Sequence, residues 1–95
     1  MKRRKLENDE IREKLDKLDK WSAAEGKLKR RFEFENFAQS LEFVNAVGAL
    51  AEAADHHPDI CFGWGYAEIE LTTHDRGGIT ETDFALAAEI DGLGR

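Results

Sequence analysis

The sequence of 95 residues is poor in cysteine and proline, with one of each, and it contains no long apolar run. A lone thiol, Cys61, excludes an internal disulfide, a redox pair and a zinc finger. No apolar run approaches the roughly 20 residues that cross a bilayer, so we expect no membrane-spanning helix. The basic start leads into acidic and polar residues, which is not typical of a secretory signal. We expect a cytoplasmic protein.

Basic residues are scarce beyond the first third of the chain. Residues 1–31 hold 12 of the 14 Lys and Arg residues and 7 of the 20 Asp and Glu residues, a balance of +5, so the remainder carries −11. A basic arm can bind nucleic acid, but the run from Lys2 to Lys5 has no interleaved aromatic residues and the whole chain carries −6. We interpret these charges as a solvated surface and expect no nucleic-acid partner.

The length permits one domain with one modest core. We assign residues 1–95 to a single domain, in which residues 1–8 form a flexible basic arm. Apolar residues then recur at spacings of four and three, which predicts an amphipathic helix over residues 9–19 with Asn8 as its N-cap.

Two further segments predict a hairpin followed by a long helix. Residues 22–25 and 28–34 flank Gly26, and the second segment alternates apolar and charged side chains as a half-buried strand does. Asn36 and Gln39 form a variant of the capping box at the start of a helix over residues 36–54. Its wide apolar stripe suggests helix contacts beyond the monomer core, although packing across a sheet explains the stripe almost as well. The stripe comprises Phe37, Leu41, Phe43, Val44, Val47, Leu50 and Ala51.

The last third of the chain predicts a second hairpin and a third helix. The alternation changes phase at Gly65, which separates strands over residues 60–64 and 67–73. Thr80, with Asp83 three residues later, caps the final helix. The order α-β-β-α-β-β-α predicts an α+β fold of two layers, with a four-stranded antiparallel sheet and three helices on one face.

All three histidines lie in two short segments that carry the most chemical information. His56 and His57 come at a corner where Pro58 ends the helical pattern, and His74 follows a predicted strand just before a glycine pair. Histidine is the side chain that exchanges protons near neutral pH, so the sequence indicates a proton-transfer site if the fold brings the segments together.

The two segments, Glu52-x-x-Asp55-His56-His57-Pro58-Asp59 and Leu71-Thr72-Thr73-His74-Asp75-x-Gly77-Gly78-Ile79-Thr80-x-x-Asp83, closely resemble the pterin-4a-carbinolamine dehydratase family. The likeness extends upstream to Trp21, Phe32, Phe34 and Phe43. It implies the same α+β fold and a homodimer or a dimer of dimers, assembled through sheet edges and the long helix. Around Gly65 the sequence departs from the usual family pattern, which affects the hairpin rather than the histidines.

The resemblance implies a lyase (hydro-lyase), 4a-hydroxytetrahydrobiopterin dehydratase, in tetrahydrobiopterin recycling for aromatic amino acid hydroxylases. Such a reaction needs an acid and a base and no metal or other cofactor. We expect His56, His57 and His74 to be catalytic: His56 and His74 exchange protons with the pterin, and His57 mainly positions it. The residues expected to contact the substrate are Glu52, Asp55, Pro58, Thr73, Asp75, Arg76 and Trp21.

Structural roles compete with several of these assignments. The histidine pair can cap helix carbonyl groups, and Trp21 or Trp64 can pack in a core rather than stack on a flat ring. Glu52, one helical turn before His56, orients that imidazole or is an exposed carboxylate. A zinc site made by the three histidines is a weaker hypothesis, because adjacent histidines lack the usual helical ligand spacing.

A different class of function also stays open. The resemblance includes proteins that act as dimerisation partners of other proteins, so the alternative to the enzyme is a non-catalytic binding module. A complete set of three histidines favours the enzyme, because a scaffold has no need of them.

Overall fold

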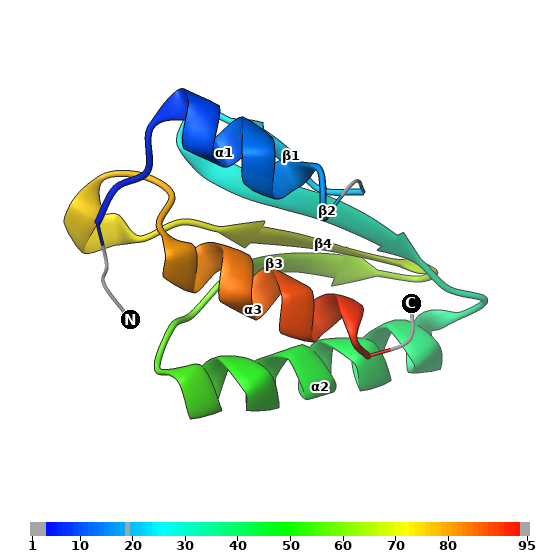
Figure 1. Cartoon of the computed structure of the whole chain (residues 1–95). Coiled ribbons are helices and arrows are strands. Elements are labelled where there is room, and N and C mark those ends of the chain that lie inside the picture. The colour runs from blue at the N-terminus through cyan, green and yellow to red at the C-terminus, as the bar shows by residue number, and fades with distance from the viewer. Residues whose placement is uncertain (1–3, 19, 94–95) are drawn as a thin grey trace.

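Four antiparallel strands form one sheet in the order β1-β2-β4-β3, in a computed structural model that describes residues 4–18 and 20–93. Three helices cover one face of this sheet (Figure 1), which confirms the predicted α+β fold. The strands are β1 (Ser22–Ala24), β2 (Lys27–Glu33), β3 (Asp59–Gly63) and β4 (Tyr66–Leu71). The helices are α1 (Asn8–Leu15), α2 (Phe37–Ala54) and α3 (Glu81–Asp91), with a short 3₁₀ turn, η1 (His74–Arg76), between β4 and α3.

The first hairpin turns at Glu25 and Gly26, which both have positive φ, 55° and 77°. Two consecutive positive φ angles define the two-residue turn whose twist suits a hairpin, and glycine adopts the second without strain. The predicted turn between β1 and β2 is therefore confirmed.

The two faces of the sheet differ in chemistry because side chains alternate along each strand. The inner face is mostly apolar and buried, with Leu28 opposite Leu71 and Phe32 opposite Ala67, and it includes Arg30, which is paired with Asp91. On the outer face, cross-strand ion pairs join Lys29 to Glu70 at 3.1 Å and Arg31 to Glu68 at 3.0 Å. The core therefore lies between the sheet and the three helices.

The second hairpin turns at Trp64 and Gly65, where Gly65 has a φ of 81°. Ile60 and Phe62 pair with Ile69 and Ala67 on the inner face, as the phase change predicted. Trp64, however, does not continue the inward alternation, because the turn leaves it 71% exposed.

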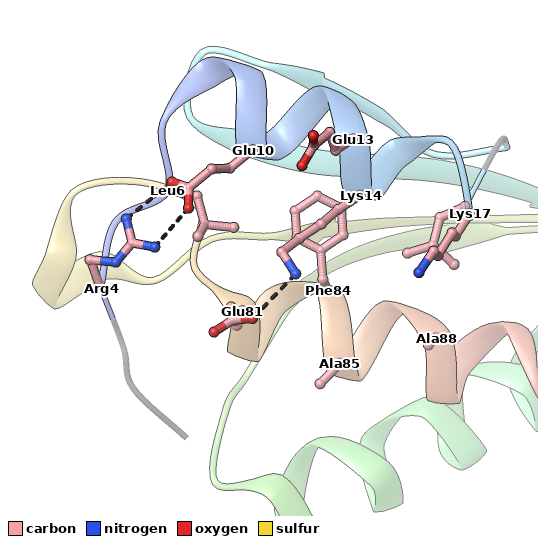
Figure 2. Close-up of a pocket in the computed structure, with 11 residues that line it drawn as sticks. Arg4, Leu6, Glu10, Glu13, Lys14, Lys17, Glu81, Phe84, Ala85 and Ala88 are labelled. Carbon is pink, nitrogen blue, oxygen red and sulfur yellow. Dashed lines mark hydrogen bonds and ion pairs between the residues drawn. The ribbon is translucent and has the colours of Figure 1, made fainter.

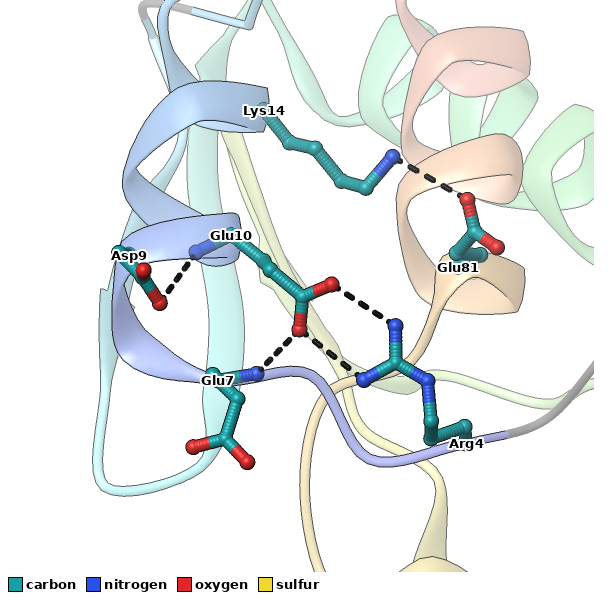
Figure 3. Close-up of polar contacts among 6 residues, drawn as sticks. All are labelled: Arg4, Glu7, Asp9, Glu10, Lys14 and Glu81. Atoms are coloured by element: carbon teal, nitrogen blue, oxygen red, sulfur yellow. Dashed lines mark hydrogen bonds and ion pairs between the residues drawn. The ribbon is translucent and has the colours of Figure 1, made fainter.

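The segment before α1 is part of the fold, in contrast to the flexible arm expected for residues 1–8. Leu6 is buried, and its N–H donates a hydrogen bond to the carbonyl of Ile79 at 2.8 Å. The Arg4 guanidinium donates two hydrogen bonds to the Glu10 carboxylate, at 2.8 and 3.0 Å, and this carboxylate also accepts the N–H of Glu7 (Figure 3). Residues 1–3 lie outside the described ranges.

The cap of α1 is Glu7 rather than Asn8, because Glu7 and Glu10 form a reciprocal capping box. The helix also ends at Leu15, several residues before the predicted end, and residue 19 lies outside the described ranges. Ile11 and Leu15 still pack against the core as the predicted stripe requires.

Helix α2 begins as predicted, with the Asn36 side chain accepting the N–H of Gln39 at 2.9 Å. Its fully buried face comprises Ser40, Phe43, Val47 and Ala51. Val44 and Leu50 of the predicted stripe pack against the core, whereas Phe37 and Leu41 face outward and are 45% and 40% exposed. Across the described ranges, no helix combines the length and the apolar character that crossing a membrane requires.

Candidate active site

The end of α2 directs the first histidine into the protein. Asp55 adopts a left-handed conformation with a φ of 51°, which Asp tolerates better than most residues. The N–H of His56 donates to the carbonyl of Ala51 at 3.1 Å, and the N–H of Asp55 donates to the carbonyl of Glu52 at 3.2 Å. This pair of bonds is a Schellman motif. It reverses the chain so that His56 points inward and the following residue points to solvent.

His56 is buried against a carboxylate from a distant part of the chain. Its Nε2 lies 2.5 Å from Oδ1 of Asp83, in the first turn of α3. The side chains of His56 and Asp83 are 6% and 0% exposed. A buried charge needs partners, because it loses the solvation that water would supply. The contact therefore ties the end of α2 to the start of α3.

Two threonines complete the environment of the Asp83 carboxylate. Its Oδ2 accepts the hydroxyl of Thr73 and the backbone N–H of Thr80, each at 2.9 Å. The two threonine hydroxyls lie 2.8 Å apart, and both residues are fully buried. The predicted capping box of Thr80 and Asp83 is thus present, and it is extended to the end of β4 by Thr73.

This buried cluster brings the two histidine-bearing segments together. Asp83 contacts His56 with one oxygen and Thr73 with the other, and His74 directly follows Thr73 in the chain. Figure 1 shows the end of α2, the η1 turn and the start of α3 at the same end of the domain. His74, Asp75 and Arg76 are all exposed on η1.

His57 lies in a different environment from His56. Its Nε2 is 2.6 Å from Oε2 of Glu52, and the two side chains are 56% and 78% exposed. Of the two alternatives for Glu52, the structure shows the exposed carboxylate, and the contact with His56 is absent. The chain reversal at Asp55 places His57, five residues after Glu52, beside that carboxylate. Pro58, the next residue, is half-buried.

A cavity of about 360 Å³ opens beside His56 between the end of α2 and the outer side of α3. Carboxylates of Asp55 and Glu89 line it together with small apolar side chains; the lining residues are Ala54, Asp55, His56, Thr82, Ala85, Leu86 and Glu89. Neither His57 nor His74 is part of this lining. In the single chain, the three imidazoles therefore do not share this cavity.

Trp21 cannot stack on a ligand in this arrangement. It is only 4% exposed, and its indole N–H donates to both carboxylate oxygens of Asp91, at 2.9 and 3.1 Å. Asp91 also pairs with Arg30 at 2.6 Å. The structure thus places Trp21 in the core, where it anchors the end of α3. Trp64 is exposed at the tip of the second hairpin.

A larger groove of about 810 Å³ lies between α1 and α3, away from the histidines (Figure 2). Leu6 and Phe84 contribute apolar surface, and an ion pair between Lys14 and Glu81, at 3.2 Å, crosses the groove. No histidine lines it, and its charged side chains are largely paired with one another. Size alone therefore does not mark the reactive site.

The zinc hypothesis finds no donor set in the structure. Within residues 4–18 and 20–93, no three His, Cys, Asp or Glu side chains are grouped as metal ligands would be. The Nε2 atoms of His56 and His57 are each engaged by a carboxylate instead.

Sequence reasoning missed Asp83 and Thr80 as members of the site. Their spacing predicts a helix cap, and the cap is present. The same carboxylate also holds His56, 27 residues earlier in the chain. The available signal was that Asp83 ends the motif shared with the dehydratase family.

Comparison with known proteins agrees with this geometry. The sequence profile of the family described as pterin 4 alpha carbinolamine dehydratase matches residues 4–93. The chain belongs to this family. The dehydratase profile thus covers both histidine segments, Thr80 and Asp83 in one continuous match.

Relatives within the dehydratase family are similar along most of the chain. A protein of Rubrobacter xylanophilus is 49% identical over 89 residues, which are 93% of this chain and 83% of the relative. A protein of Sulfolobus acidocaldarius is 44% identical over 87 residues, 92% of this chain and 96% of the relative. Both are provisionally named pterin-4-alpha-carbinolamine dehydratase.

Two solved structures share the fold. A transcriptional coactivator/pterin dehydratase from Brucella melitensis superposes with a TM-score of 0.91 and 28% identity, over 96% of this chain and 99% of that chain. A pterin dehydratase-like protein, described as a RuBisCO assembly factor in the alpha-carboxysome, superposes with a TM-score of 0.64 and 34% identity. That match covers 77% of this chain and 84% of the other.

Proposed function

We propose that this protein is a 4a-hydroxytetrahydrobiopterin dehydratase, a hydro-lyase that works by histidine acid-base catalysis without a metal or cofactor. The observation that carries the proposal is the buried contact between His56 and Asp83 beside an open cavity. A histidine held by a carboxylate at a cavity is suited to exchanging a proton with a bound molecule. Membership of the dehydratase family supports a pterin as that molecule.

The reaction removes water from a pterin that carries a hydroxyl group on C4a and a hydrogen on N5. An acid delivers a proton to the departing hydroxyl group, the C4a–O bond breaks and water leaves. A base takes the proton from N5, and the N5–H electron pair forms the C4a=N5 double bond of the quinonoid dihydropterin. One proton is given and one is taken, so no net proton is consumed.

Three histidines divide this work. His56 and His74 exchange the two protons, and His57 positions the pterin while Glu52 orients its ring. The substrate enters at the end of the domain that the end of α2 and the η1 turn share, where Asp55 lines the cavity beside His56. Pro58, Asp75 and Arg76, outside that lining, are the further residues we expect to contact it. Thr73 acts from within the protein, because it is buried and bonded to Asp83.

A stopped-flow assay of carbinolamine dehydration tests the assignment. The purified protein accelerates the reaction, and His74→Ala lowers the turnover by about 10² or more, the lower end of what acid-base catalysis contributes. His74 is exposed and outside the core, so the variant keeps the unfolding midpoint of the wild type. Unchanged turnover in a folded His74→Ala protein contradicts the assignment.

The cellular role we propose is tetrahydrobiopterin recycling in the cytoplasm, coupled to an aromatic amino acid hydroxylase. We further propose a homodimer or a dimer of dimers. The exposed apolar side chains of α2, Phe37 and Leu41, support an interface on this helix. Phe37 also stacks on Phe62 of the edge strand β3, with ring centroids 5.6 Å apart. Light scattering of wild type and Leu41→Glu checks the assembly, which the added charge weakens.

A second candidate is a non-catalytic binding module for a protein partner. It is favoured by the outward-facing Phe37 and Leu41 and by the similarity to a RuBisCO assembly factor. A stoichiometric protein partner that is lost in Leu41→Glu, together with no measurable pterin binding, would establish this candidate over the enzyme.

A further inference from the structure

The hydrogen bonds around Asp83 determine which atom of His56 can exchange a proton. A carboxylate only accepts, whereas each imidazole nitrogen donates or accepts according to the tautomer. The direction of every bond in the cluster can therefore be worked out from the groups whose role is fixed. This inference rests on the proposed function and adds the reacting atom and the residues that position it.

Oδ2 of Asp83 accepts two hydrogen bonds. The backbone N–H of Thr80 can only donate, and it reaches Oδ2 of Asp83 at 2.9 Å. The hydroxyl of Thr73 donates to the same oxygen at 2.9 Å. A carboxylate has no proton to donate, and both of its oxygens accept. Asp83 is therefore an acceptor on its other oxygen as well.

The threonine hydroxyls have one consistent arrangement. Thr73 uses its single proton on Asp83, so the contact of 2.8 Å between the two hydroxyls requires Thr80 to donate to Thr73. The oxygen of Thr80 remains free to accept the N–H of Thr82, which lies 3.2 Å away. Each threonine hydroxyl therefore donates one hydrogen bond, and the bonds hold the Asp83 carboxylate in one orientation.

The last contact fixes the imidazole. Oδ1 of Asp83 accepts, so Nε2 of His56, 2.5 Å away, carries a proton in both the neutral and the cationic ring. The other nitrogen, Nδ1, has no hydrogen-bond partner among the described residues and keeps contact with solvent. His56 lines the cavity between α2 and α3.

We propose that Thr73, Thr80 and Asp83 are positioning residues that lock His56 as the Nε2–H tautomer, so that Nδ1 is the atom that exchanges a proton with the substrate. Each supplies a separate constraint: Thr80 and Thr73 orient the carboxylate, and the carboxylate selects the tautomer. In a serine protease triad, an aspartate selects the histidine tautomer in the same chemical manner.

Substitution of Asp83 by Asn reverses this selection. The amide oxygen takes the place of Oδ2, because Thr80 N–H and the Thr73 hydroxyl require an acceptor there. The amide NH₂ group then faces His56 and donates to Nε2, which leaves the proton on Nδ1. Asp83→Asn therefore switches the neutral ring to the Nδ1–H tautomer and lowers turnover by about 10² or more.

Histidine ¹⁵N spectra measure the tautomer directly and need no substrate, with His57→Gln and His74→Gln used to assign the signal of His56. The wild type shows protonated Nε2 and unprotonated Nδ1, Asp83→Asn shows the reverse, and Glu81→Gln is unchanged. Glu81 is the matched control, since it lies in the same first turn and loses the same charge without contacting His56. A Nδ1–H ring in the wild type, or the same tautomer in folded Asp83→Asn, overturns the proposal.

The role of Thr73 is tested by removing its hydroxyl group and then restoring it with serine. Thr73→Val removes one donor from Asp83 and lowers the turnover about 5- to 10-fold, the effect of one ordinary hydrogen bond. Thr73→Ser restores it. Thr72→Val, which removes a hydroxyl bonded to the Gly26 carbonyl and not to the Asp83 cluster, does not change it. Equal turnover in Thr73→Val and wild type overturns the role of Thr73. If the wild type shows no dehydration, the proposed function fails, while the spectra still decide the tautomer.

Discussion

Two adjacent histidines meet a carboxylate at almost the same distance, and their surroundings make the two contacts different. His56 lies 2.5 Å from Asp83 with both side chains buried, whereas His57 lies 2.6 Å from Glu52 with both side chains mostly exposed. Water competes for the exposed pair and screens it, so it contributes little to stability. The buried pair is largely shielded from water, so solvent replaces a lost partner poorly.

The comparison shows that a short distance alone does not measure the importance of a contact. Asp83 also receives two donors from the end of β4 and the start of α3, so the buried contact has a single geometry. Glu52 is the only partner of the His57 ring within the described residues, and its long side chain has several rotamers. We expect the first contact to define the chemistry and the second to adjust how the substrate lies.

The largest difference appears when each carboxylate is removed. Asp83→Ala leaves the donors of Thr80, Thr73 and His56 buried without an acceptor, and we expect it to lower the free energy of unfolding by about 3–5 kcal/mol. Glu52→Ala changes it by less than about 1 kcal/mol, because the pair is exposed. Urea unfolding of the two variants measures both values, and similar losses would remove the distinction drawn between the pairs.

A smaller difference separates the caps of the two long helices. Thr80→Ala removes the N-cap of α3 inside the buried cluster, and we expect a loss of about 2 kcal/mol, the upper end for caps. Asn36→Ala removes the exposed N-cap of α2 and costs about 0.5–1 kcal/mol. Thermal or urea unfolding provides the comparison. An equal loss of stability in Thr80→Ala and Asn36→Ala would show that burial does not determine the cost of removing a cap.

The smallest effect belongs to an exposed carboxylate with strong partners. The Arg4 guanidinium and the Glu7 N–H lower the pKa of Glu10 to about 2. Because this folded-state pKa is below the unfolded value, the stabilisation is present above the unfolded pKa and disappears as the pH falls toward 2. Wild type is thus slightly more stable than Glu10→Gln at pH 7, and the gap closes in acid and in high salt.

Carboxyl NMR titration of Glu10 measures that pKa directly, with Glu13→Gln as the stability control on the same helix. A titration of Glu10 near pH 4.5 would contradict the contact with Arg4. The same outcome would also weaken the case for an ordered segment before α1, since Arg4 precedes that helix.

Local sequence patterns were sufficient for the elements and for part of the site. The charged alternation of β2, the glycine at each hairpin and the Thr80–Asp83 cap each depend on neighbouring residues only, and each prediction is confirmed. The helix end before His56 was likewise predicted from Pro58. These features follow from backbone and side-chain geometry within a few residues.

The partners of the side chains could not be obtained in that way. Helical spacing suggested that Glu52 meets His56, but the left-handed Asp55 rotates the chain and exchanges the two histidines. Asp83 reaches His56 only because α3 packs against α2, a tertiary contact that no local pattern contains. Burial of Trp21 likewise depends on Asp91, 70 residues later.

The most direct test of the account compares the two histidines by stopped-flow dehydration, with kcat and KM determined separately. His56→Gln lowers kcat by about 10² or more, since it removes the group that exchanges the proton. His57→Gln raises KM and changes kcat by less than about 10-fold, since it removes a positioning contact. An equal fall of kcat in both variants, or a fall in His57→Gln alone, would contradict the account.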